Sequence, residues 1–176
     1  MTPAEQKQFG ALYDKHIRKI YDFIYFKTYH KETAEDLASQ TFLKAAENFV
    51  NFNPDKGTFS AWLYKIARNT VIDYYRTHKV EANIEDVFDL SQENDVLGDF
   101  DRKENLQKVK NYLSKLSSEQ REIIVMRVWQ EMSYEEIAEV LGKSQESCRM
   151  MFSRTLSKLK QEMPLTLFIL FLIKSI

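Results

Sequence analysis

The chain has 176 residues and a hydrophobic content of 44%, so it can bury a core as one domain or as two small ones. Its net charge of −1 argues against a protein that holds nucleic acid through bulk positive charge, because such domains are usually basic. The single cysteine, Cys148, excludes an internal disulfide, and with three scattered histidines it predicts no metal site. We expect a reducing, cytoplasmic setting and no cofactor, and the polar N-terminus, MTPAEQKQFG, lacks the apolar run of a signal peptide.

The predicted fold is all-α, because there are only four glycines and three prolines and no sustained alternation of polar and apolar residues. A first amphipathic helix is expected over residues 4–29. Its apolar residues recur at helical spacing: Phe9, Leu12, Tyr13, Ile17, Ile20, Tyr21 and Ile24.

A second helix is expected to run to about Phe49 from a capping box of Thr33 with Asp36. Its packing residues are Ala34, Leu37, Ala38, Thr41, Ala45 and Phe49. Asp36, Gln40 and Leu43 share another face, and an outward leucine there indicates a docking surface. The alternative is a partly exposed leucine of no consequence, which is common.

The stretch Gly57–Lys79 is predicted to form one helix, opened by Thr58 as N-cap after the turn at residues 53–57. One stripe is apolar: Phe59, Leu63, Ile66, Ala67, Thr70 and Tyr74. The opposite stripe carries Trp62, Lys65, Asn69, Asp73 and Arg76. A ring, cations and an amide in one row are suited to binding unstacked DNA. The alternative interpretation is an ordinary solvated face with one exposed tryptophan.

Residues 80–101 contain eight acidic side chains and no Lys or Arg, whereas the segments on either side are locally basic. We expect two small helical domains at 1–79 and 104–163, joined by an acidic linker at 80–103 and followed by an apolar tail at 164–176.

Three capped helices are expected in the second domain after a helix that begins near Arg102. Ser117 with Gln120 and Ser133 with Glu136 form capping boxes, and Ser144 caps the helix that follows the turn glycine Gly142. The last two helices have the spacing of a helix-turn-helix, with Cys148 at an inward position. The second of these helices presents residues able to read base edges or hold phosphates: Ser144, Gln145, Glu146, Arg149, Ser153 and Arg154.

Three segments together resemble the extracytoplasmic-function sigma factors of bacterial RNA polymerase: AEDLASQTFLKA, GTFSAWLYKIARNTVIDYYR and LSSEQREIIVMRVWQEMSYEEIAEVLGKS. The resemblance implies a two-domain, all-helical initiation factor that acts with core polymerase on promoter DNA. We expect no enzymatic activity, because the sequence contains no carboxylate pair, metal cluster, nucleophile constellation or phosphate loop. It implies that the Asp36 helix binds the polymerase clamp, that the first domain melts the minus-ten element, and that the Gln145 helix enters the major groove of the minus-thirty-five element. A flipped base would be held by the loop residues Phe52, Asn53, Lys56, Gly57 and Thr58.

The chain departs from the family pattern at two places. Ser39-Gln40 stands where Gln-Glu is frequent, and Met151 stands where a basic residue is common. We therefore expect minus-thirty-five contacts at Arg149 and Arg154 rather than at Met151.

The apolar tail Leu165–Ile173 is too short to cross a bilayer, since its helix spans about 14 Å against roughly 30 Å of hydrocarbon. It could pack on a domain, lie in an interface or bind a partner such as an anti-sigma factor, or it could be a non-native end of the reading frame. We expect no stable homo-oligomer, and a cytoplasmic protein, with sequestration at the membrane through an anti-sigma factor as a variant. Two other classes stay open: a stand-alone helix-turn-helix regulator and a membrane-tethered interaction protein.

Overall fold

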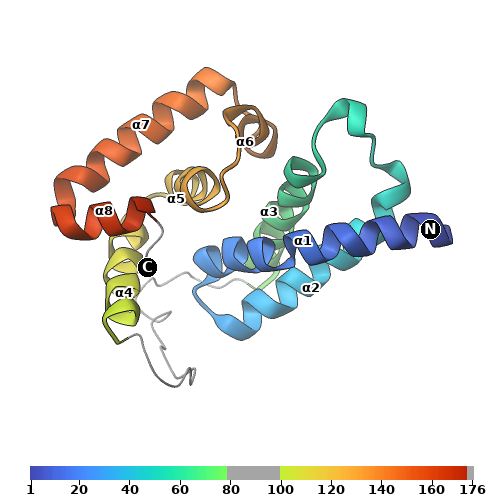
Figure 1. Ribbon diagram of the computed structural model, residues 1–176, viewed down its shortest axis with the longest axis horizontal. Coiled ribbons are helices and arrows are strands. Elements are labelled where there is room, and N and C mark those ends of the chain that lie inside the picture. Colours follow the sequence, from blue (N-terminus) through green and yellow to red (C-terminus); the bar gives the residue numbers. More distant parts are fainter. Residues whose placement is uncertain (79–99, 174–176) are drawn as a thin grey trace. The chain divides into compact units, whose positions relative to one another are not determined.

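The computed structural model describes residues 1–78 and 100–173, and most of the expected acidic linker lies outside these residues. The described residues form helices and contain no strand, so the all-α prediction is confirmed (Figure 1). The α-helices are α1 Pro3–Thr28, α2 Lys31–Asn48, α3 Phe59–His78, α4 Phe100–Ser114, α5 Ser118–Ile124, α6 Tyr134–Leu141, α7 Gln145–Glu162 and α8 Leu165–Ile173. Two short 3₁₀ turns, η1 Phe49–Asn51 and η2 Pro54–Lys56, separate α2 from α3, and a π-helical turn, η3 Val125–Trp129, follows α5.

The described helices divide into two compact units. The first contains α1, α2 and α3 and also takes in residues 135–143, and the second contains α4, α5, η3, α7 and α8. Each unit is described by itself below.

In the first unit, α1, α2 and α3 pack against one another around a core of aliphatic and aromatic side chains. Its largest fully buried members are Ile20, Phe23, Ile24, Leu37, Leu63 and Tyr64. The Phe23 and Tyr64 rings meet edge to face with centroids 5.1 Å apart, which joins α1 to α3. The expected packing residues of α2 are all buried, and Phe42, which the pattern did not single out, is buried with them.

Polar contacts fix the same three helices. Lys44 Nζ donates to Thr70 Oγ1 at 3.2 Å between α2 and α3, and the Tyr75 hydroxyl donates to the Lys27 carbonyl at 3.1 Å between α3 and α1. These bonds satisfy polar groups close to the core, where a buried donor or acceptor without a hydrogen bond would cost about 1–3 kcal/mol of stability.

The start of α2 differs from the sequence prediction. The N-cap is His30, whose Nδ1 accepts from the Thr33 backbone N–H at 3.2 Å, and α2 already begins at Lys31. The capping box of Thr33 with Asp36 is therefore wrong, because Thr33 lies inside the first turn. The chain reaches this cap through Tyr29, a residue in the left-handed conformation (φ 52°) that ends α1. The turn between the two helices is therefore tight, and the cap of α2 lies three residues earlier in the chain than predicted.

Two helices of the second unit, α5 and α7, begin at the N-cap residues that the sequence predicts. Ser117 and Gln120 form a reciprocal capping box at α5, with N···O distances of 3.3 and 3.1 Å. Ser144 caps α7 by accepting from the Ser147 N–H at 3.2 Å, and α7 then runs from Gln145 to Glu162 as expected.

The turn after α6 is the glycine turn that the sequence predicts. Gly142 has φ 66°, and the Lys143 N–H reaches back to the Ala138 carbonyl at 3.1 Å. This is the left-handed helix end that glycine adopts without steric cost. Cys148, six residues after Gly142, is fully buried as expected.

The apolar tail forms α8 and packs within the second unit, which is one of the alternatives left open by its sequence. Leu167, Phe168 and Phe171 are buried, and the Phe171 ring meets Trp129 edge to face at 5.7 Å. Among the described helices, none combines the length and the apolar character that a bilayer crossing needs.

Candidate nucleic-acid interface

The outer face of α3 is exposed along most of the predicted stripe. Lys65, Asn69 and Arg76 are exposed and Asp73 is half-buried, while Phe59, Leu63, Ala67 and Thr70 of the opposite stripe are buried. Arg76 and Asp73 form an ion pair at 3.0 Å, with the Arg76 side chain 75% exposed. Such an exposed pair contributes at most about 1 kcal/mol to stability, so the cation remains available to a phosphate.

Trp62 at the start of this stripe is held by a cluster of aromatic rings. Its indole lies 5.2 Å from the Phe52 ring and 5.5 Å from the Phe59 ring, and Phe49 joins them at 6.4 Å from Phe52. Trp62 is half-buried, so one part of the indole packs on the cluster and the rest meets solvent. A rigid, partly exposed ring of this kind can stack on a base without first losing conformational freedom.

His16 of α1 supports the same cluster. Its ring lies 5.6 Å from Phe59, and its Nδ1 is buried without a hydrogen-bond partner among the described residues. Burial lowers the pKa of His16, and the nearby charges of Lys15 and Lys19 lower it further. The imidazole is thus kept neutral at neutral pH and behaves as part of the aromatic core.

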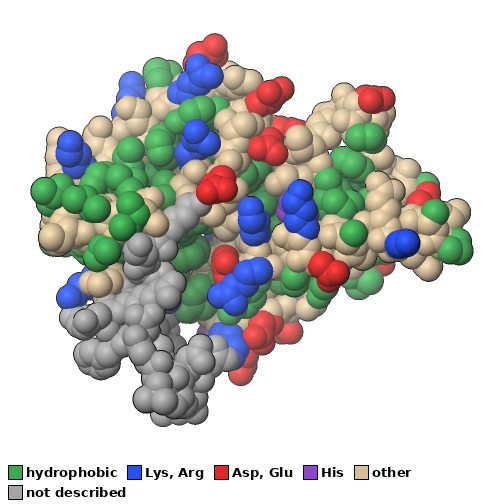
Figure 2. Space-filling model, in the orientation of Figure 1, with side chains coloured by type: hydrophobic (Ala, Val, Ile, Leu, Met, Phe, Trp, Pro, Cys, Tyr) green, Lys and Arg blue, Asp and Glu red, His purple; other side chains and the backbone are tan. Residues whose placement is uncertain are grey.

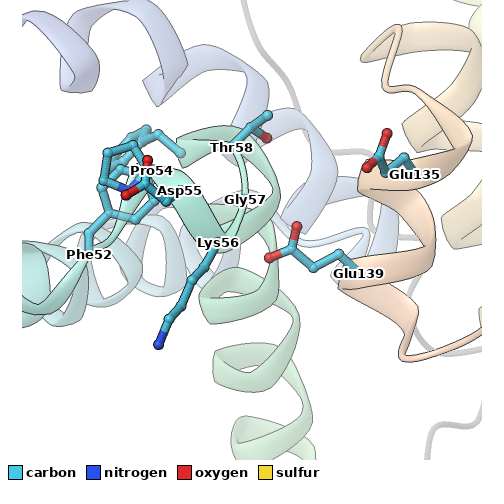
Figure 3. A pocket seen from close by; sticks show the side chains of 9 residues that line it. Phe52, Pro54, Asp55, Lys56, Gly57, Thr58, Glu135 and Glu139 are labelled. Carbon is cyan, nitrogen blue, oxygen red and sulfur yellow. The ribbon is translucent and has the colours of Figure 1, made fainter.

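The loop from Phe52 to Thr58 precedes α3, and Figure 3 shows several of its side chains. Short-range hydrogen bonds shape this loop. The Asn53 side chain accepts from the Asp55 N–H at 2.9 Å and starts the 3₁₀ turn Pro54–Lys56. Thr58 Oγ1 accepts from the Ala61 N–H at 3.1 Å, which makes Thr58 the N-cap of α3 as predicted. In Figure 3 the Lys56 ammonium extends away from Thr58, so the loop carries a cation on its outer side.

Gly57 gives this loop a backbone that other residues avoid. Its φ of 155° with ψ of 172° lies in a region open almost only to glycine. The loop can therefore enter α3 directly, with the half-buried Phe52 on the aromatic cluster and the exposed Asn53 and Lys56 in solvent.

The predicted docking face of α2 is solvent-exposed. Asp36 and Gln40 are exposed, and Leu43 is 61% exposed on the same helix. Val50, in η1, is another aliphatic residue exposed to the same extent.

On α7, all six predicted DNA-facing residues are exposed: Ser144, Gln145, Glu146, Arg149, Ser153 and Arg154. Met150 is 53% exposed beside them and Met151 is half-buried. An apolar pair therefore stands between the two arginines in the sequence, and the assignment of phosphate contacts to Arg149 and Arg154 stays a prediction.

The structure adds a feature that the sequence did not indicate. The Arg149 guanidinium lies 5.5 Å from the centre of the Tyr134 ring, and the Arg127 guanidinium lies 4.9 Å from the same ring. Arg127 is also anchored by a 2.9 Å hydrogen bond to the Met132 carbonyl, and Tyr134 packs against Phe152. Two cations thus lie on one tyrosine at the start of α6, where the sequence had assigned only a helix start.

Acidic and basic side chains are interspersed over the face drawn in Figure 2, in keeping with the near-zero net charge. Among the described residues, no three or more His, Cys, Asp or Glu side chains are grouped closely enough to hold a metal ion.

Two family descriptions match the chain: Sigma-70 region 2 over residues 12–81 and Sigma-70 region 4 over residues 106–159. The chain is 31% identical over 167 residues to the ECF RNA polymerase sigma factor BldN of Streptomyces coelicolor, a match that covers 91% of this chain but only 62% of BldN. It is 30% identical over 161 residues to the RNA polymerase sigma factor YlaC of Bacillus subtilis, covering 86% of this chain and 90% of YlaC.

Two solved structures resemble the fold. CnrH in complex with the cytosolic domain of CnrY matches with a TM-score of 0.68 and 26% identity, covering 89% of this chain and 87% of CnrH. The sigma factor RpoE in complex with the anti-sigma factor NepR, from Bartonella quintana, matches with a TM-score of 0.71 and 25% identity, covering 88% of this chain and 96% of the RpoE chain.

The chain thus belongs to the sigma-70 family of RNA polymerase sigma factors and contains its regions 2 and 4. Within that family it belongs to the extracytoplasmic-function group, as the resemblance of its sequence motifs implied.

Proposed function

We propose that this sigma factor carries core RNA polymerase to its promoters and opens them with the first domain while the second domain reads the upstream element. In this proposal the outer face of α3 and the loop Phe52–Thr58 hold the separated strand at the minus-ten element. The domain limits follow the sequence expectation, at 1–79 and 104–163.

The observation that carries the proposal is the partly exposed Trp62, held by Phe52 and Phe59 at the head of an exposed row of Lys65, Asn69 and Arg76. The ring supplies a stacking surface, the lysine and arginine neutralise phosphates, and the amide can hydrogen-bond a base edge. Phe52 and Lys56 of the loop, with Gly57 turning its backbone, would line the place of an unstacked base.

For the upstream element, we propose that α7 enters the major groove with Gln145, Arg149 and Arg154 toward the DNA. The double cation contact on Tyr134 supports a wider role, in which Arg127 and Tyr134 act with Arg149. The tyrosine would hold the Arg149 guanidinium in one orientation, and Arg127 would add a second cation for the DNA backbone.

The exposed Asp36, Gln40 and Leu43 would bind the clamp of the polymerase large subunit, since a protruding leucine between polar residues is typical of a docking surface. The structures of CnrH with CnrY and of RpoE with NepR support the further proposal that an anti-sigma factor regulates this chain. We place its action in the cytoplasm, where polymerase and promoter DNA meet.

Run-off transcription with purified core polymerase tests the proposal. Wild-type protein should yield a promoter-specific transcript, while Trp62→Ala should reduce open-complex formation about 5- to 150-fold, the equivalent of one lost stacking contact of roughly 1–3 kcal/mol. Asn69→Ala should act in the same direction, and both variants should bind core polymerase like wild type. Asp14→Ala, at an exposed position of α1 outside the proposed faces, is the matched control.

Two outcomes would contradict the proposal. One is an equal loss of polymerase binding and promoter opening in Trp62→Ala. The other is specific binding of duplex promoter DNA by the free protein without any polymerase-dependent transcript, which would identify a stand-alone regulator.

A further inference from the structure

The C-terminal helix α8 has two apolar faces, and only one of them is covered. Leu167, Phe168 and Phe171 are buried in the second unit, whereas Leu165, Ile169, Leu172 and Ile173 are 66%, 47%, 40% and 59% exposed. The four exposed residues follow a helical spacing of four, three and one, so they lie along one side of α8. Figure 2 shows hydrophobic side chains gathered over the region where Figure 1 draws α8.

The four exposed apolar residues of this face are all aliphatic. Thr166, which is also exposed, is the one polar residue among Leu165–Ile173, and no charged residue occurs in that range. A helix of a soluble domain normally places polar residues on its outer side. The outward side of α8 is therefore suited to an apolar environment rather than to water.

The size of the face argues against a second copy of the chain as its occupant. Four partly exposed aliphatic residues amount to an apolar patch on the order of a few hundred Å². A stable protein interface buries about 800 Å² on each partner and surrounds its apolar core with a polar rim. Two α8 faces packed together would fall well short of that area.

The charges beside α8 favour a lipid surface. Lys158 and Lys160 are exposed near the end of α7, directly before α8, and Lys174 follows it in the sequence. Glu162 is the one acidic residue from Lys158 to Ile176, and it lies 4.0 Å from Lys158. An apolar helix flanked by lysines is the combination that binds anionic membranes reversibly, because a weak apolar anchor needs a second, electrostatic contribution.

Trp129 adds an interfacial side chain next to the same helix. Its ring contacts Phe171 at 5.7 Å and remains half-exposed. Tryptophan is enriched at the boundary between hydrocarbon and water because its ring is apolar and its N–H is polar.

We propose that the exposed side of α8 (Leu165, Ile169, Leu172 and Ile173) is a reversible anchor for an anionic membrane surface, with Lys158 and Lys160 contacting lipid headgroups. The helix would lie in the plane of the interface, since it is too short to span the bilayer. Such an anchor would hold the sigma factor at the membrane without a membrane-bound partner. This inference is independent of the proposed promoter contacts, which use α3 and the part of α7 from Gln145 to Arg154.

Co-sedimentation of the full chain with vesicles tests this anchor. Wild-type protein should sediment with vesicles of phosphatidylglycerol and phosphatidylcholine and much less with phosphatidylcholine alone. The double variant Ile169→Glu with Leu172→Glu should lower the partition coefficient by about tenfold or more, because it places two anions in the apolar contact. Lys158→Gln and Lys160→Gln should each lower binding about fivefold on anionic vesicles only.

Val50→Glu is the matched control, because it also replaces an exposed aliphatic residue by glutamate but lies on η1, away from α8. It should bind vesicles like wild type, and the double variant should retain its helical circular dichroism and its run-off transcription. The proposal is overturned if wild-type protein does not bind the anionic vesicles, if it binds neutral vesicles equally well, or if Val50→Glu loses as much binding as the double variant. A dimer in sedimentation equilibrium that disappears in the double variant, without vesicle binding by wild type, would instead assign the face to a second copy.

Discussion

Two glycines offer a test of the backbone reasoning, because the same substitution should have opposite effects at each. Gly142 has φ 66° and ends α6, whereas Gly10 lies inside α1. An added Cβ would meet no heavy atom within 4 Å at either position, so packing does not complicate the comparison. Only the backbone conformation differs.

The expected magnitudes follow from that difference. Gly142→Ala should lower the free energy of unfolding by about 1–2 kcal/mol, the cost of a left-handed residue with a Cβ. Gly10→Ala should raise it by about 0.5–1 kcal/mol, because alanine loses less conformational entropy than glycine in a helix. Gly142→Asn should lose less than Gly142→Ala, since asparagine tolerates the left-handed region.

Urea unfolding can follow the two units separately, because the chain has two tryptophans and each lies in a different unit. In a Trp62→Phe background, Trp129 fluorescence reports the second unit; in a Trp129→Phe background, Trp62 reports the first. With a slope of about 1–3 kcal/mol per molar urea, a change of 1 kcal/mol moves the midpoint by roughly 0.3–1 M.

The reasoning would be refuted if Gly142→Asn lost as much stability as Gly142→Ala, since the left-handed backbone would then not be the cause. It would also be refuted if Gly10→Ala were destabilising. Because Gly142 also sets the turn before α7, Gly142→Ala should weaken upstream promoter binding by the holoenzyme, and Gly142→Asn should restore much of it.

Further predictions concern other contacts described above. Tyr134→Ala should weaken holoenzyme binding to the upstream element about 2- to 10-fold in a mobility-shift assay, while Tyr134→Phe, which keeps the ring over which both arginines lie, should bind like wild type. Ser144→Ala should lower the stability of the second unit by about 1 kcal/mol through loss of the α7 cap, with Ser153→Ala, which caps nothing, as its control in the urea assay. His16 has a folded-state pKa below its ordinary value of 6.5, so its contribution to stability is complete above pH 6.5 and is lost as the pH falls toward the folded pKa. His16→Phe should therefore reduce the decline in stability below pH 6.5, and an unchanged decline would show that His16 does not cause it. Phe52→Leu should keep most of the stability of the first unit. Because the ring contact at 5.2 Å is lost, Trp62 should emit at a longer wavelength than in wild type, and promoter opening should be slower.

Much of the architecture could be predicted because its signals are local. The α7 limits, the Ser117 and Ser144 caps and the turn at Gly142 each depend on residues within one helical turn of each other. The outward stripe of α3 and the exposed residues of α7 also followed from helical period alone. The start of α2 could not be predicted in this way, because a left-handed Tyr29 places His30 as the cap, and neither residue is a usual one for that position.

Features that join distant parts of the chain needed the tertiary structure. Phe52 and Phe59 hold Trp62 from two elements, and Tyr134 receives guanidinium groups from residues before and after it in the chain. The apolar tail is the clearest case: apolar residues occur on every side of its helix, and which side is buried depends on the packing of the second unit. Helical period and caps are properties of neighbouring residues, so most helices and their order could be predicted from them, and three motif segments indicated the family. The choice among equivalent apolar faces depends on which complementary surface they meet, and that is known only once the chain is folded.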